Sequence, residues 1–243
     1  MAALALLVAL PARAAEVISS NTVGYMKLAI PAGGYTMIAN PFVEVGTEAA
    51  IGLDEMFDND KTAAKAGTSS DSADKIMVWN GAAFETLAYF KQTKGGKFWA
   101  NASGTATTDP FPLNSGVFYQ SAGTTNTLLT ISGQVKSSSQ TLPIAHGCYT
   151  LLENPFPIDL PIQSFNVAGA KGATSSDSAD KILIWNGVGY DTYYLKKTKS
   201  GQFWADSSGT QTSYAIPSGA GFFYQSVGEE DFNVTIESPL SAE

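Results

Sequence analysis

The sequence has few of the residues that most often carry out chemistry. Its 243 residues include one cysteine, one histidine and one arginine. The single cysteine, Cys148, excludes an intrachain disulfide. No paired-histidine metal motif, nucleophile elbow, phosphate loop or dinucleotide fingerprint is present. His146 and Cys148 would share one face of a strand, but the repeat described below has Ala32 and Gly34 at these positions. We therefore expect no catalytic residues and no enzyme activity.

Charged side chains are also scarce, at 15% of the chain, against roughly a quarter in an average soluble domain. The only arginine, Arg13, lies in an apolar run over residues 1–14 that ends in an A-x-A pattern. This run predicts a cleaved signal peptide and is too short to span a membrane. No later apolar run is long enough, so we expect no membrane insertion of the mature chain.

The predicted mature chain is acidic, with thirteen lysines against 22 acidic residues. It lacks arginine, the side chain best suited to bidentate phosphate recognition. We therefore exclude nucleic acid and anionic membrane surfaces as partners. With the signal peptide, these features predict an extracellular or cell-surface protein.

The sequence contains a long internal repeat. TSSDSADKI occurs at 68–76 and again, identical, at 174–182. Upstream, GGYTMIANPF (33–42) matches GCYTLLENPF (147–156); downstream, SGVFYQS (115–121) matches AGFFYQS (220–226). The first copy is longer by a segment around 53–65. The order and length of the match predict two modules, at 15–133 and 134–243.

Most of the remaining pattern is typical of strands. Short runs rich in β-branched and aromatic residues alternate with clusters of Gly, Ser, Asn, Pro and Asp. Asn-Gly at 80–81 and at 186–187 follows a strand-like run and predicts a hairpin. The only helical pattern, over 45–57, is weak. The sequence thus predicts an all-β chain of two tandem antiparallel β-sandwich modules, jelly-roll-like in form.

The ordered motifs resemble a known kind of module. Both copies contain G-x-Y followed by N-P-F, then D-K-I-x-x-W-N-G, and then a G-F-F-Y-like strand. This order is similar to a β module of surface and secreted proteins in Bacteroidota and Verrucomicrobiota. The second copy, with IPSGAGFFYQS (216–226), fits best, whereas FPLNSGVFYQS (111–121) lacks the Pro-Gly-type turn. The resemblance implies a cell-surface or matrix location and a scaffold or binding role.

Two sets of duplicated residues are candidate ligand sites. The first contains Asp71 and Asp74, with Asp177 and Asp180 in the second copy. Clustered carboxylates and hydroxyls are typical Ca²⁺ ligands. The alternative is a turn that closes a loop before a central strand. We expect no required cofactor, and Ca²⁺ is the one candidate ion.

The second set is aromatic. Trp79 and Trp185 end fully apolar strands and are expected to fill the core. Trp99 and Trp204 lie among Lys, Gln, Asn and Asp, which predicts partial exposure and makes them candidates for stacking on glycans.

The stretch before the first module, residues 16–30, is strand-like and includes Val17, Ile18, Val23 and Tyr25. Such a strand could pair with the exposed edge of another subunit and so build a polymer. Alternatively, it folds back on its own module. The leading hypothesis is a non-catalytic structural protein that assembles with itself into a surface layer, matrix or filament. The alternative hypothesis is a glycan-binding adhesin.

Overall fold

The computed structural model describes residues 22–59, 62–165 and 167–238. Within these ranges the chain is nearly all strand, and every named strand pair is antiparallel. The prediction of an all-β fold is therefore confirmed. The predicted signal peptide at 1–14, together with Val17 and Ile18, lies outside the described residues.

The first module contains a five-stranded sheet of order β2-β7-β4-β5-β6. Its hairpin between β4 and β5 begins at Asn80, whose Oδ1 accepts the backbone N–H groups of Ala82 and Ala83. Gly81 has φ 100°, which a side chain would disfavour. The sheet is formed by β2 (Tyr35–Ile38), β4 (Lys75–Trp79), β5 (Phe84–Thr93), β6 (Gly96–Ala100) and β7 (Val117–Gln120).

A second sheet of order β1-β8-β3 covers one face of the first. It is formed by β1 (Val23–Ile30), β3 (Phe42–Val43) and β8 (Thr127–Val135). Alternate residues of β1 and β8, such as Ile30 and Ile131, point inward and pack with Phe90 of the first sheet. The extra segment of this copy supplies α1 (Leu53–Phe57), whose apolar residues join the same core. The weak helical pattern thus yields a helix of little more than one turn.

The second predicted module contains a similar set of sheets. Its five-stranded sheet has the equivalent order β10-β16-β12-β13-β14, and its second sheet is the pair β9-β17. A small pair, β11 (Leu160–Pro161) and β15 (Ala215–Ile216), is added. The other strands are β9 (Gln140–Ile144), β10 (Tyr149–Glu153), β12 (Lys181–Trp185), β13 (Tyr190–Thr198), β14 (Gly201–Ala205), β16 (Gly221–Gln225) and β17 (Phe232–Ile236). Single 3₁₀ turns complete the chain at Ser70–Ser72, Ile162–Ser164 and Ser176–Ser178.

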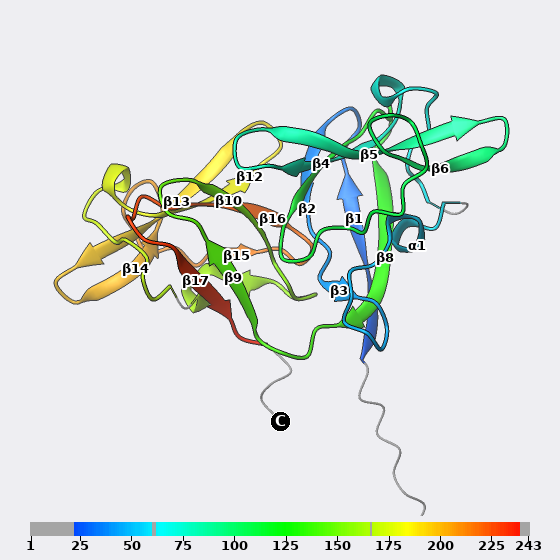
Figure 1. The fold of residues 1–243 in the computed structure, drawn as a ribbon. Helices are drawn as coiled ribbons and strands as arrows, with labels where there is room; N and C mark the ends of the chain where they lie inside the picture. The colour runs from blue at the N-terminus through cyan, green and yellow to red at the C-terminus, as the bar shows by residue number, and fades with distance from the viewer. Residues whose placement is uncertain (1–21, 60–61, 166, 239–243) are drawn as a thin grey trace, which may run out of the picture.

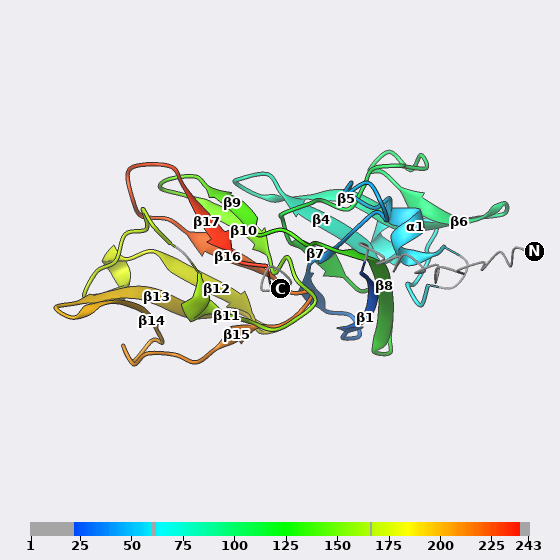
Figure 2. The same cartoon turned by 90° about the horizontal axis from the view of Figure 1, so that it is seen from below.

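The two modules lie side by side along the long dimension of the molecule, joined by the short linker at 136–139 (Figures 1 and 2). The outer faces of their five-stranded sheets pack against each other through an apolar cluster. Its buried members are Met37, Phe118, Leu151 and Phe223, and its half-buried members include Met77, Trp79, Phe84, Leu183 and Trp185.

The contacts across this interface are reciprocal. Trp79 packs on Phe223 with ring centroids 5.3 Å apart, and Trp185 packs on Phe118 at the same distance. Nε1 of Trp79 donates to the carbonyl of Tyr149 at 3.1 Å, and Nε1 of Trp185 donates to that of Tyr35 at 2.9 Å. The two tryptophans expected inside the module cores therefore join the modules to each other.

Candidate functional site

The Ser-Asp loops hold one aspartate inside the protein. Asp74 is 1% exposed. Its carboxylate accepts hydrogen bonds from the hydroxyl of Tyr119 at 2.7 Å and from the backbone N–H groups of Ala122 (2.7 Å) and Lys65 (2.9 Å). Burial, with Asp74 beside it, raises the pKa of the Tyr119 hydroxyl far above its usual value. The phenol is thus a permanent donor to this carboxylate.

The second module builds the same arrangement around Asp180. Its donors are the hydroxyl of Tyr224 at 3.0 Å and the backbone N–H groups of Val227 (2.8 Å) and Lys171 (3.0 Å). Burial likewise raises the pKa of Tyr224 far above its usual value. Each buried aspartate therefore ties the start of a central strand to two distant segments of its module.

The other aspartate of each loop points outward. The side chain of Asp71 is 99% exposed and lies 3.7 Å from the ammonium of Lys75, and Asp177 is exposed as well. The outward aspartate of each loop lies within a 3₁₀ turn that ends two residues before the buried aspartate. No group of three or more His, Cys, Asp or Glu side chains that could hold a metal occurs within residues 22–59, 62–165 and 167–238. The geometry supports loop closure by Asp74 and Asp180, and Ca²⁺ binding at these loops stays a prediction.

The predicted exposure of Trp99 and Trp204 is wrong. Trp99 is 1% exposed and packs between Phe57 and Phe90, with ring centroids 5.3 and 5.2 Å away. Trp204 is 2% exposed and packs edge-on against Tyr224. Neither indole has a face open to a sugar ring, so neither can stack on glycans.

The polar neighbours of these tryptophans have another role. Asn101, just after β6, accepts the backbone N–H groups of Ser103 and Thr105 with its side chain. Asp206 makes the same turn after β14. The hydroxyl of Ser208 and nearby N–H groups lower the pKa of Asp206. These polar residues therefore build a turn, whereas the tryptophan before each of them faces the core.

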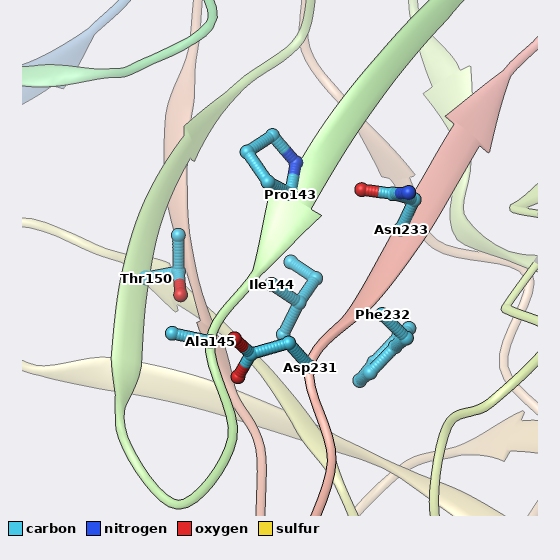
Figure 3. A pocket seen from close by; sticks show the side chains of 7 residues that line it. All are labelled: Pro143, Ile144, Ala145, Thr150, Asp231, Phe232 and Asn233. Atoms are coloured by element: carbon cyan, nitrogen blue, oxygen red, sulfur yellow. The ribbon is translucent and has the colours of Figure 1, made fainter.

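A pocket of about 310 Å³ opens where the two sheets of the second module meet. Figure 3 shows its seven lining residues, which lie on β9, β10 and β17 and at the positions just after β9 and just before β17. The side chain of Asp231 is turned toward the turn after β9. Nδ1 of His146 lies 2.7 Å from a carboxylate oxygen of Asp231. The hydrogen bond from the backbone N–H of His146, followed by that from its ring, lowers the pKa of Asp231.

This pocket belongs to the module architecture. The first module has a pocket at the equivalent place, where Asn126 accepts the backbone N–H of Ala32 as Asp231 accepts that of His146. The thiol of Cys148 donates to the carbonyl of Ala145 at 3.5 Å. The geometry therefore pairs His146 with Asp231 and assigns it a role in locking the turn.

A buried ion pair lies at the junction of the modules. Nζ of Lys136, the first linker residue, is 2.5 Å from Oε1 of Glu153, which ends β10. Their side chains are 6% and 0% exposed. Burial is the main cause that raises the pKa of Glu153 to about 7, against the opposing effect of Lys136. The sequence analysis did not predict this pair. The signal for it in the repeat is a difference between the copies, since Ala39 occupies the position equivalent to Glu153.

The N-terminal strand folds onto its own module. β1 pairs with β8 along its whole length, from Val23 opposite Gln134 to Ile30 opposite Thr127. The described part of the predicted assembly strand is thus already paired on one side. Its other side is a sheet edge. Val23 and Tyr25, 62% and 73% exposed, project from this edge strand on the outer face.

Comparison with protein-family models, curated proteins and solved structures gives no match for this chain. In the described part of the chain, no helix is long and apolar enough to cross a membrane. The fold defines the protein as an all-β chain of several antiparallel sheets.

Proposed function

We propose that this chain is an exported, non-catalytic structural protein that assembles with copies of itself at the cell surface or in the extracellular matrix. The observation that carries the proposal is the sheet edge at β1, whose outer face presents the exposed Val23 and Tyr25. The export segment and the scarcity of catalytic groups, both read from the sequence, support the same assignment.

The outer face of β1 and β8 is suited to contact with protein. Val23, Tyr25 and Leu128 are 62%, 73% and 55% exposed on this face, and Lys27 is the only charged residue of β1. Natural edge strands are usually protected by charges, prolines or bulges, because an unprotected edge recruits another strand. The single lysine leaves this edge weakly protected, as a surface for strand addition requires.

The reciprocal interface between the modules supports a structural role as well. Four aromatic side chains, Trp79, Phe118, Trp185 and Phe223, interlock across it. An interface of interlocked aromatic side chains restrains relative domain motion. A subunit that transmits load through an assembly needs such stiffness, whereas an enzyme that closes over a substrate needs a hinge.

The test is the assembly state of the secreted protein, by negative-stain microscopy and sedimentation over a range of concentrations. We expect filaments or sheets from the natural chain and a monomer from Tyr25→Lys, which adds a charge to the edge. Val188→Lys is the matched control, because Val188 is 92% exposed in the hairpin between β12 and β13. A natural chain that stays monomeric at high concentration, with and without Ca²⁺, contradicts the proposal.

The alternative function is glycan binding. Trp99 and Trp204, the tryptophans that were candidates for it, are buried in the module cores. Tyr25 is the most exposed aromatic side chain in the described part of the chain. A glycan array probed with the natural chain and with Tyr25→Lys therefore tests the alternative with the same variant. Binding that disappears in Tyr25→Lys without any self-assembly would favour the adhesin.

A further inference from the structure

If Lys136 and Glu153 form only an ion pair, their burial is unfavourable for the free energy of folding. Both side chains are at least nine-tenths buried, and no hydrogen bond of normal geometry reaches Oε2 of Glu153. Removing two charges from water costs more than a single contact returns unless every remaining lone pair is satisfied. An orphaned carboxylate oxygen at a fully buried site therefore needs an explanation.

The pair is specific to the junction. In the first module the position of Glu153 is held by Ala39, whose backbone N–H donates to the carbonyl of Gly219. The duplicated strand therefore folds without a carboxylate at this position. Lys136 belongs to the linker, which occurs once. The pair therefore occurs once in the chain, and the first module folds without an equivalent of it.

We propose that Lys136 and Glu153 are the site of an intramolecular isopeptide bond between Nζ of the lysine and Cδ of the glutamate. Three features of the geometry favour the reaction. The amine and the carboxyl are already in contact, both side chains are buried, and the backbone N–H of Asn114 faces the carboxyl. Holding reactants in contact and providing a donor for a developing oxyanion are general means of catalysis.

The reaction is a condensation and needs no co-reactant. A proton passes from the Lys136 ammonium to the Glu153 carboxylate, which leaves a neutral amine beside a carboxylic acid. The lone pair of Nζ then attacks Cδ, and the N–H of Asn114 donates to the oxygen that gains charge. The bond from Cδ to the hydroxyl oxygen then breaks, and that oxygen leaves as water with its own proton and one more from nitrogen. The oxygen that faces Asn114 stays as the carbonyl of the amide. One amide forms, one water is released, and nothing is oxidised or reduced.

The product suits the site better than the ion pair. A neutral amide has no buried charge, and its oxygen faces the N–H of Asn114. A partly open hollow of about 210 Å³, lined by Lys136, Asn114 and Ser138 among others, lies beside the pair and gives the released water a way out. The bond would fasten the linker to β10 in a chain whose single cysteine cannot form an intrachain disulfide.

Mass spectrometry of the denatured secreted protein tests the proposal. We expect a mass lower by one water molecule than that of the mature sequence, counted from the measured N-terminus. Trypsin should fail to cut after Lys136, so that residues 98–171 remain one peptide that also lacks one water. Lys75, whose exposed partner Asp71 is 3.7 Å away, is the internal control and should be cut normally.

Two variants complete the test. Lys136→Arg and Glu153→Ala should both have the full mass of their sequences, and Glu153→Ala should be cut after residue 136. Because masses are read on denatured protein, poor folding of a variant does not obscure the result. A natural chain of full mass that trypsin cuts after Lys136 overturns the proposal and leaves an ordinary buried ion pair.

Discussion

At the scale of single residues, buried polar groups with distant partners determine which loops close. Asp74 accepts hydrogen bonds from Tyr119 and Ala122, which lie 45 and 48 residues further along the chain. The sequence contains the aspartate but does not reveal these partners. A calcium ligand and an aspartate that closes a loop through hydrogen bonds therefore cannot be distinguished from the sequence alone. The two aspartates of each loop differ only in which one faces inward, and tertiary packing decides this.

Replacing the inward aspartate should therefore destabilise the protein much more than replacing the outward one. Asp180→Ala leaves the Tyr224 hydroxyl and two backbone N–H groups without their partner, and we expect a loss of about 3 kcal/mol in the free energy of unfolding. Asp177→Ala should stay within about 0.5 kcal/mol of the natural chain. Urea denaturation measures both, and equal losses would contradict the assignment.

Tyr119 and Tyr224 give the same arrangement an alkaline signature. Their raised pKa values mean that the folded state keeps protons that the unfolded state loses above a pH of about 10. Stability should consequently fall as the pH rises above that value. In a spectrophotometric titration, these two tyrosines should ionise only on unfolding. Ionisation of all ten tyrosines in a folded chain would count against the buried pairs.

At the scale of elements, the turns could be predicted from the sequence, whereas the face of the sheet on which a side chain lies could not. The Asn-Gly hairpins form as predicted, because the turn depends on neighbouring residues alone. The tryptophans were assigned the wrong way round because the five-stranded sheets are covered on both faces. Trp99 faces its own core, and Trp79 faces the other module. A strand buried on both faces has no simple alternation to reveal this.

The second hairpin offers a direct test of its turn. Gly187 has φ 101° with open space around it, so Gly187→Ala should cost about 1–2 kcal/mol from backbone strain alone. Gly189 has similar open space and no positive φ, and Gly189→Ala should stay within about 0.5 kcal/mol. Thermal unfolding of the two variants side by side measures the difference. Equal stabilities would mean that the turn has another conformation.

At the scale of the whole molecule, the repeat in the sequence predicts two modules but not how they contact each other. The interface is made by the outer faces of the two five-stranded sheets, through residues such as Phe118 and Phe223. These residues read as core in the sequence, because an apolar strand looks the same whether it packs within a module or between modules. The ion pair of Lys136 with Glu153 was not predicted for a related reason, since the two residues come into contact only at the junction of the modules.

Weakening the interface should uncouple the modules. Trp79→Ala and Trp185→Ala each remove an aromatic contact and a hydrogen bond across it, and each should cost about 2 kcal/mol. Calorimetry should resolve one unfolding transition for the natural chain and two for the double variant. Val188→Ala, at a side chain 92% exposed, is the control and should keep the single transition. Two transitions in the natural chain would contradict the coupling.

The reciprocity of Trp79 and Trp185 has a consequence for assembly. Equivalent patches that exchange the same contacts form an isologous surface, the kind that ordinarily makes closed two-fold dimers. Here both equivalent patches belong to one chain and bury each other, so this surface is not available to a second chain. Contacts between chains are thus left to patches that differ from each other, such as the edge at β1. Unlike patches join head to tail, and such a series stays open unless its rotation closes a ring.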